Sequence, residues 1–349
     1  MRWIQGLRRP GVPAVLGGAF LFGISTPLAK LLLYHMSAGL LAGLLYLGSG
    51  VGLAFYRRAA RARPVQLSRS QWRWLLGAVV AGGVIGPLLL MTGLTRLPAA
   101  NASLLLNAET VFTALLAWFV FHENTGRRVI LGLTAIVAGA VLLGAPVETA
   151  STGMWPALAV VGACLAWGID NNVTRKIALV DATWLASVKG LAAGTVNLAA
   201  ALGAGARLPA WPVVAGALLV GLVAYGVSFA LFVVGLRHLG AARAGAYFAI
   251  APFIGAVAAV ALGEPVTVPL VLAGGLMVLG VWLHLTERHD HVHTHEALAH
   301  SHEHAHDVHH RHTHGEPVPA ATRHTHWHEH APTTHAHAHF PDAHHDHDH

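Results

Sequence analysis

The stretch that decides the fold is residues 93–144, which begins GLTRLPAANASLLLNAETVFTALLAWFVFHENTGRRVILG. Two long apolar runs are joined by a short polar turn, so the stretch predicts a helical hairpin. A shorter echo begins at residue 235 and reads GLRHLGAARAGAYFAIAPFIGAVAAVALGEPVTVPLVLAGGLMVLGVWL. Gly93 matches Gly235 and, after a one-residue gap, Glu123 matches Glu264. The sequence therefore predicts a duplicated hairpin.

The composition is that of a membrane protein. The chain has 349 residues, of which 54% are hydrophobic and 11% are charged, whereas soluble domains carry about 25% charged residues. The apolar runs are too long for soluble core helices, so we expect an all-α polytopic membrane protein. The single cysteine, Cys164, rules out a disulfide framework. The sequence contains no nucleotide-binding loop, dinucleotide fingerprint or nucleophile elbow, which argues against an ATP-driven pump and against an enzyme.

Ten apolar runs are candidates for crossing a bilayer, because a crossing helix needs about 20 such residues. We place them at 11–33, 38–56, 74–94, 99–121, 128–145, 153–174, 182–202, 211–236, 241–262 and 266–285. The first run follows a basic start, as a signal peptide does. It lacks a small-residue cleavage site and continues to Lys30, so we expect a retained helix.

Basic residues indicate how the chain is oriented. Fifteen of them fall at the N-terminus and in the even-numbered connections, against only Arg96 and Arg207 in the odd-numbered connections. Because cytoplasmic loops carry an excess of Lys and Arg, we expect a multi-pass protein of the cell (inner) membrane with both termini in the cytoplasm.

The first and sixth runs also match each other, with Gly23 facing Gly168 and Ile24 facing Ile169. The repeating unit therefore has five helices, and an odd number makes the second copy enter the membrane from the opposite side. Such an inverted repeat is typical of secondary transporters. The predicted organisation is a basic N-terminal segment, a first repeat, a second repeat and a disordered tail, at 1–10, 11–145, 153–285 and 289–349.

Glycine pairs at GxxxG spacing are frequent in these runs. They occur at Gly39 and Gly43, at Gly48 and Gly52, and at Gly82 and Gly86. We expect such pairs to allow close helix packing inside the chain, with a homodimer interface as the alternative.

Two segments carry a family resemblance: ETVFTALLAWFVFHEN at 109–124 and APFIGAVAAVALGEP at 251–265. With them, residues 12–285 resemble the ten-helix members of the drug/metabolite transporter superfamily that have two EamA domains. Members often carry E-P-V-F-A-A-L-L followed by G-E. Here Thr110 replaces the proline and His122 replaces the glycine, while the second copy has Ala251 in place of Glu109. The resemblance implies export or exchange through a central cavity and leaves the substrate open.

Glu109 is the strongest candidate for chemistry. It lies in the middle of the fourth run, where a charge costs about 3 kcal/mol to insert and should face a cavity or be paired. At helical spacing, Glu109 lies within the same half of the helix circumference as Ser103, Asn107, Thr110 and Thr113. These residues form a polar stripe on a helix that otherwise consists mainly of Leu, Ala and Phe. We expect Glu109, with Asn107, to bind the substrate or a coupling proton. The alternative is a structural carboxylate paired with Lys189 or Lys30.

Other polar residues lie deep in the predicted membrane region. Asp170 and Asn171 fall near the cytoplasmic end of the sixth run, where they line the cavity floor or form an ordinary polar helix end. Lys189 lies inside the seventh run and needs a partner. Glu123 and Glu264 lie in turns, so we expect both to cap helices.

The tail is a separate kind of signal. Residues 289–349 hold 23 of the 27 histidines, nine acidic residues and two arginines. They include few large apolar residues, which predicts disorder. Neutral imidazole binds Zn²⁺, Ni²⁺, Co²⁺ and Cu²⁺, so we expect a flexible region that binds several divalent ions, and no other cofactor. The alternative is a pH-sensitive solubilising tail.

The candidate metal ligands are the histidines in alternating His-X-His runs. They are His291, His293, His295, His302, His304, His306, His312, His314, His324, His326, His328, His335, His337, His339, His345, His347 and His349.

The leading functional hypothesis is a secondary transporter in the lipid bilayer that exports a small solute or ion, without a nucleic-acid partner. The tail favours a divalent transition metal or a metal-linked substrate. The apolar core has no cluster of His or Cys and favours an amino acid or another metabolite, with a regulatory tail. A hypothesis of a different class is a membrane-anchored metal buffer or sensor that transports nothing.

Overall fold

The structure is a computed structural model. It describes residues 11–62, 64–121, 127–144, 153–177, 180–239, 241–285, 290–295, 298–304, 324–330 and 333–338. The chain divides into a helical unit that reaches Glu287 and a tail unit at Arg288–Pro341.

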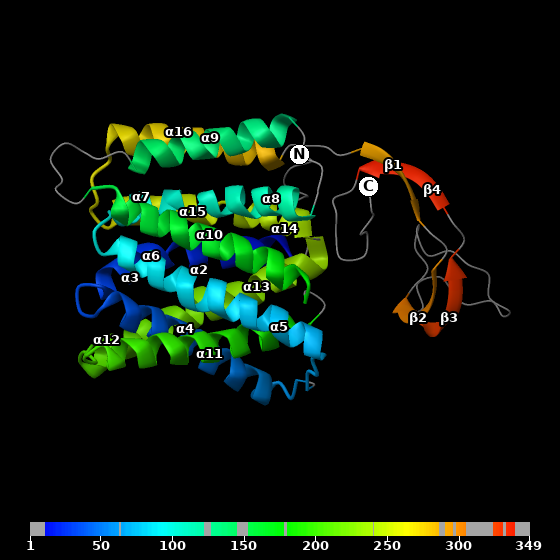
Figure 1. Ribbon diagram of the computed structural model, residues 1–349, viewed down its shortest axis with the longest axis horizontal. Coiled ribbons are helices and arrows are strands. Elements are labelled where there is room, and N and C mark those ends of the chain that lie inside the picture. Colours follow the sequence, from blue (N-terminus) through cyan, green and yellow to red (C-terminus); the bar gives the residue numbers. More distant parts are fainter. Residues whose placement is uncertain are drawn as a thin grey trace. The chain divides into compact units, whose positions relative to one another are not determined.

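The helical unit is built from rods that lie nearly parallel to one another, with α9 and α16 at one edge and α4, α11 and α12 at the other (Figure 1). The elements of its first half are α2 (Val12–Gly23), α3 (Ser25–Leu32), α4 (Ala38–Ala59), α5 (Arg69–Ala78), η1 (Val79–Ile85), α6 (Gly86–Leu94), α7 (Ala99–Leu105), α8 (Ala108–Phe121) and α9 (Arg127–Gly144). Those of its second half are α10 (Trp155–Arg175), α11 (Ala182–Gly203), α12 (Trp211–Val220), η2 (Gly221–Val227), α13 (Ser228–Leu239), α14 (Ala241–Phe248), α15 (Ala251–Ala261) and α16 (Val268–Leu285).

Each of the ten predicted runs is largely helical over its described residues. Among those residues, seven helical segments are long and apolar enough to cross a membrane, and Ala251–Ala261 and Val268–Leu283 are shorter apolar helices. Helix α10 has 21 residues, but its polar stretch at 170–172 lowers its hydropathy. The unit is thus all-α and polytopic, as expected, whereas a count of ten crossings goes beyond these seven segments.

Several rods are interrupted near their middle. Ile24 separates α2 from α3, and short turns separate α7 from α8 and α14 from α15. Prolines explain part of this, because Pro27 and Pro252 lack the N–H that a continuous helix would use. The rods that contain η1 and η2 widen instead into π-helical turns of seven residues each. The widened turns lie in the third and eighth predicted runs, which are equivalent positions of the two halves.

Glycines bring α4 and α11 into direct contact. A Cβ placed on Gly43 would lie 2.6 Å from the Leu198 nitrogen, and one on Gly50 would lie 2.7 Å from the Gly190 carbonyl carbon. As the residue number rises along α4 it falls along α11, so the two helices are antiparallel. Because their backbones touch, any side chain at these glycines would force the helices apart.

Helices α9 and α16 pack in the same way. A Cβ on Gly139 would lie 3.1 Å from the Ala273 carbonyl oxygen, and one on Gly280 would lie 2.5 Å from the Gly132 carbonyl oxygen. The glycines of the predicted GxxxG pairs likewise face other helices of the same chain. They are Gly39, Gly43, Gly48, Gly52, Gly82 and Gly86.

The tail differs from the disordered segment that its composition predicts. Within its described residues the backbone forms β1 (Asp290–His295), β2 (Leu298–His304), β3 (His324–His330) and β4 (Thr333–Ala338). Strand β1 pairs with β4 and β2 pairs with β3, both antiparallel. The disordered tail is therefore not confirmed. A physical reason is that His-X-His alternation has period two, which is also the period of a strand.

Candidate functional site

A polar cluster lies where α8 meets α10. The half-buried Glu109 accepts a hydrogen bond of 2.8 Å through Oε1 from the Asn171 side-chain amide. The same Asn171 amide lies 3.2 Å from Thr113 Oγ1, one helical turn further along α8. Gly168 permits this approach, since a Cβ there would lie 2.9 Å from Phe112 Cβ. The structure thus brings together Glu109 and Asn171, two of the predicted site residues.

The neighbouring residue on α10, Asp170, forms an ion pair with Lys189 of α11. Asp170 is 6% exposed and also accepts a 3.1 Å hydrogen bond from Thr174 Oγ1. The space for its carboxylate is provided by Gly82 of η1, where any Cβ would overlap it. Lys189 therefore has the partner that its depth requires, and the partner is Asp170. Glu109 is bonded instead to the neutral amide of Asn171.

Asn107, the remaining predicted site residue, lies apart from this cluster. It is 2% exposed, and its amide donates to the Leu104 carbonyl at 2.9 Å and contacts Met277 of α16. It satisfies the backbone where α7 ends, which is a structural role. The helical-wheel argument fails here because the fourth run is interrupted between residues 105 and 108, so angles cannot be extrapolated through it.

The widened turn η1 exposes carbonyl groups that three side chains satisfy. The Gly82 carbonyl accepts hydrogen bonds from Tyr46 at 2.8 Å and from Trp167 at 2.9 Å. The Asn197 amide donates to the Gly83 carbonyl at 3.3 Å. Sequence reasoning missed this group, although the adjacent Gly82 and Gly83 and the polar Asn197 in an apolar run were available signals. These contacts fix η1 against α4, α10 and α11 beside the polar cluster.

Lys30 and Glu264 act on helix ends. The Lys30 ammonium donates to the carbonyls of Leu94 at 2.7 Å and Leu97 at 2.9 Å, after the last turn of α6. The Glu264 carboxylate accepts from the amides of Ala99 and Ala100 at 2.6 and 2.8 Å, at the start of α7. The positive charge of Lys30 lies at the C-terminal end of α6 and the negative charge of Glu264 lies at the N-terminal end of α7, so the helix dipoles stabilise both charges. Glu264 thus caps a helix, as expected, while Glu123 lies outside the described residues.

A second ion pair joins the ends of α4 and α11. Arg57 lies 2.7 Å from Asp181 Oδ1 and donates to Thr183 Oγ1 at 2.8 Å. Asp181 caps α11 by accepting from the amides of Thr183 and Trp184. Burial alone would raise the pKa of Asp181, but the hydrogen bonds from Thr183, Arg57 and Trp184 outweigh it and lower the pKa to about 2. Sequence reasoning used Arg57 for orientation and did not find this pair.

Buried polar groups, interrupted helices and two matching helical halves are features that membrane transport proteins share. Residues 9–145 and 154–286 both match the EamA-like transporter family, and the chain belongs to that family. The matched ranges nearly coincide with the two predicted repeats, and the His-rich tail lies outside them. Family membership agrees with the drug/metabolite transporter resemblance carried by residues 109–124 and 251–265.

Three curated proteins are similar to this chain. An uncharacterized transporter of Methanothermobacter thermautotrophicus is 29% identical over 78% of this chain and 85% of its own length. A probable amino-acid metabolite efflux pump of Salmonella typhimurium is 28% identical over 49% of this chain and 54% of its own length. A probable 4-amino-4-deoxy-L-arabinose-phosphoundecaprenol flippase subunit ArnE of Pseudomonas aeruginosa is 42% identical over 22% of this chain and 64% of its own length.

One solved crystal structure shares the fold. It has a TM-score of 0.59 and 19% sequence identity, and the match covers 78% of this chain and 95% of the other.

Proposed function

We propose that this protein is a secondary transporter that exports a small solute with an amino group, and that Glu109 binds that group. The observation that carries the proposal is a half-buried carboxylate in the middle of the helical unit that hydrogen-bonds to the neutral Asn171. A carboxylate at this depth is costly unless a cation or a proton joins it. In the proposal, Glu109 binds the ammonium group of the substrate in one half of the transport cycle and a proton in the other half, so its charge is compensated throughout the cycle.

The substrate class has support from outside the site. The names of two relatives contain an amino compound, an amino-acid metabolite in one and an amino sugar in the other. Thr113 and the Asn171 carbonyl add hydrogen-bonding groups next to Glu109. Asp170 and Lys189 neutralise each other beside it, so the net charge of the cluster comes from Glu109. Such a cluster favours a cationic group over an anionic one.

The transport path in this proposal lies between two inverted repeats of five crossings each, with both termini in the cytoplasm. Three observations support it: the antiparallel glycine contacts of α4 with α11 and of α9 with α16, the equivalent positions of η1 and η2, and the bias of basic residues among the connections. Inverted repeats place the substrate near the midplane, where the halves meet.

The test is efflux of radiolabelled amino acids and amino metabolites, measured as uptake into everted membrane vesicles with an imposed pH gradient. Glu109→Gln keeps the hydrogen bond to Asn171 but removes the charge, so we expect flux to fall by about tenfold or more. Glu109→Asp should retain part of it. Thr134→Ala, which removes a hydroxyl bonded to the Ile130 carbonyl on an exposed face, is the matched control. Wild-type flux in Glu109→Gln would refute the role of Glu109.

A second function is favoured by the tail, where 23 of the 27 histidines lie. We propose that the tail binds divalent transition metal ions on the cytoplasmic side and links transport to metal supply. Equilibrium dialysis with Ni²⁺ should show several ions per full-length chain and almost none after deletion of 289–349. If amino-compound efflux responds to Ni²⁺ in the same way in the full-length protein and in the deletion variant, the tail does not link transport to metal supply. If the full-length protein binds metal but transports none of the tested solutes, the result would instead favour a membrane-anchored metal buffer or sensor that transports nothing.

A further inference from the structure

Two charged side chains hold the connection between α6 and α7, and they come from different halves of the chain. Lys30 of α3 belongs to the first half and donates to backbone carbonyls at the end of α6 and just after it. Glu264, which follows α15, belongs to the second half and accepts from the Ala99 and Ala100 amides at the start of α7. Hydrogen bonds that involve a charged group are among the stronger ones. The start of α7 is therefore tied firmly to the other half of the chain.

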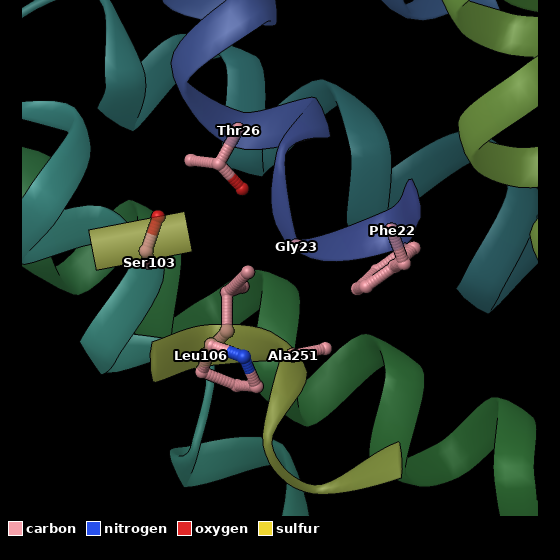
Figure 2. A pocket seen from close by; sticks show the side chains of 7 residues that line it. Phe22, Gly23, Thr26, Ser103, Leu106 and Ala251 are labelled. Carbon is pink, nitrogen blue, oxygen red and sulfur yellow. The ribbon is translucent and has the colours of Figure 1, made fainter. Parts of the chain in front are cut away.

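The two halves also meet closely along the rest of α7. Helix α7 packs against α15. A Cβ on Gly255 of α15 would lie 2.7 Å from Ser103 Oγ of α7, and one on Gly23 of α2 would lie 2.5 Å from the Ala251 carbonyl oxygen. Figure 2 shows Gly23, Ser103 and Ala251 around this junction, and the space left between them is too small for a water molecule. The helical unit is therefore closed between its halves at the end where α7 begins.

The internal repeat supplies an equivalent junction for comparison. By the sequence match between the two hairpins, Ser103 of α7 corresponds to Gly245 of α14, and Gly255 of α15 corresponds to Thr113 of α8. Figure 1 shows α8 and α14 at one end of the rods and α7 and α15 towards the other end, as an inverted repeat requires. The pair of Gly245 and Thr113 is therefore the counterpart of the pair of Ser103 and Gly255.

The counterpart junction is open. Gly245 is exposed, and a Cβ placed on it would meet no atom within 4 Å in the part of the chain that the structure describes. Thr113 is half-buried, and Asn171, which bonds to it, is exposed. Since Asn171 also bonds to Glu109, the open junction leads to the polar cluster. The contact that closes one end of the unit is thus not made at the other end.

The interruptions of the rods allow the two ends to move separately. Helix α7 ends at Leu105 and α8 begins at Ala108, and in the equivalent rod α14 ends at Phe248 and α15 begins at Ala251. A few residues at the end of an element can absorb a large change of backbone angles. Each half-rod can therefore change its tilt while the other half-rod of the same rod keeps its contacts.

A transporter with inverted repeats opens to one side while it is closed to the other, by moving one repeat against the other around a fixed site. The contacts that close one end must break before that end can open. We propose that Glu264 and Lys30 form a latch that keeps the unit closed where α7 begins, and that breaking this latch opens that end and closes the junction at Gly245. The latch rests on the proposed transport function, in which the closed end faces outward and the open end faces the cytoplasm.

The test measures how fast single cysteines react with N-ethylmaleimide in the purified full-length protein in detergent, in a Cys164→Ser background. With the latch intact, we expect Ser103→Cys to react slowly at the closed junction and Gly245→Cys to react rapidly at the open one. Glu264→Ala removes both hydrogen bonds to α7. It should speed the labelling of Ser103→Cys by about tenfold or more and slow that of Gly245→Cys.

A second latch variant and two controls accompany this measurement. Lys30→Met removes the other half of the latch and should shift both rates in the same directions, so a folding defect in Glu264→Ala leaves it informative. Ser187→Cys replaces a buried hydroxyl of α11 that is bonded to the Trp184 carbonyl, and it should react slowly in every variant. Ser68→Ala removes the N-cap of α5 within the first half and should leave all three rates unchanged.

Opposite changes at Ser103→Cys and Gly245→Cys would support the latch. Unchanged labelling of Ser103→Cys in both latch variants, or faster labelling there without a fall at Gly245→Cys, would overturn it. Labelling needs no substrate, so its result is separate from the proposed role of Glu109. Opposite changes in labelling together with wild-type efflux in Glu109→Gln would support the latch and remove only the role of Glu109.

Discussion

At the residue scale, the ion pair of Asp170 and Lys189 shows how polar groups are tolerated inside the helical unit. Their side chains are 9% and 19% exposed. In such surroundings each charge is stable only with the other, because removing one partner leaves an uncompensated buried charge. The pair thereby fixes α10 to α11 next to Glu109.

We therefore expect Asp170→Asn and Lys189→Met each to lower the free energy of unfolding by about 3–5 kcal/mol, with the double variant Asp170→Asn/Lys189→Met less affected than either single one. Thermal denaturation in detergent, compared across the four proteins as a double-mutant cycle, measures this. If the two losses simply add, the residues are not energetically coupled.

Asp181 is a residue whose contribution depends on pH. Its pKa is lowered to about 2 in the folded protein, against an unperturbed value of about 3.9. A lowered pKa means that the charged form stabilises the fold above pH about 4 and that this contribution is lost as the pH falls towards 2. Asp181→Asn keeps an N-cap but removes the charge. We expect the variant to melt at a lower temperature than the wild type at pH 6, and the difference to shrink steadily below pH 4. A difference independent of pH would contradict the Arg57–Asp181 pair.

At the element scale, η1 depends on the side chains that satisfy its carbonyls. Tyr46 and Trp167 both donate to the Gly82 carbonyl, so either donor alone can satisfy it. We expect Tyr46→Phe to cost about 1 kcal/mol, and Trp167→Phe to cost more, because Trp167 is 7% exposed and its replacement also leaves a cavity. The double variant should lose more than the sum, because the carbonyl is then left without a partner. Chemical denaturation measures this, and Tyr56→Phe, at a tyrosine that is 59% exposed, is the control. Simple additivity would show that water replaces the lost donors.

The positions of the helices could be predicted from the sequence, whereas most of the contacts between helices could not, and both outcomes have physical reasons. Apolar runs of the required length located the ten helical regions, because lipid leaves the backbone few alternatives. Glu109 and Asn171, which form a hydrogen bond in the structure, were singled out because polar residues stand out in such runs, and their role in transport stays a prediction. Asn107 was misplaced because the break after Leu105 rotates the next residues away from the face that a continuous helix would give them. The partner of Lys189, the η1 contacts and the Arg57–Asp181 pair were not predicted, because they join residues far apart in the chain and no local pattern indicates them.

At the scale of the whole molecule, the predicted topology can be tested directly. In a Cys164→Ser background, we expect Arg207→Cys to react with a membrane-impermeant maleimide from outside the cell and Ala60→Cys to react only after permeabilisation. Both positions lie in described connections between helices, and the expectation follows from the bias of basic residues. Labelling of both cysteines from the same side would exclude the inverted repeat of five crossings.

The paired π-helical turns also carry historical information. A π turn in an α-helix is the trace of one additional residue, because the wider ring accommodates an insertion without breaking the rod. Turns η1 and η2 span Val79–Ile85 and Gly221–Val227, at equivalent places of halves whose sequences have otherwise diverged widely. One insertion in an ancestral half-length chain accounts for both, whereas two independent insertions would have to coincide. The simplest account is therefore that the widened turn is older than the duplication that gave the two matching halves.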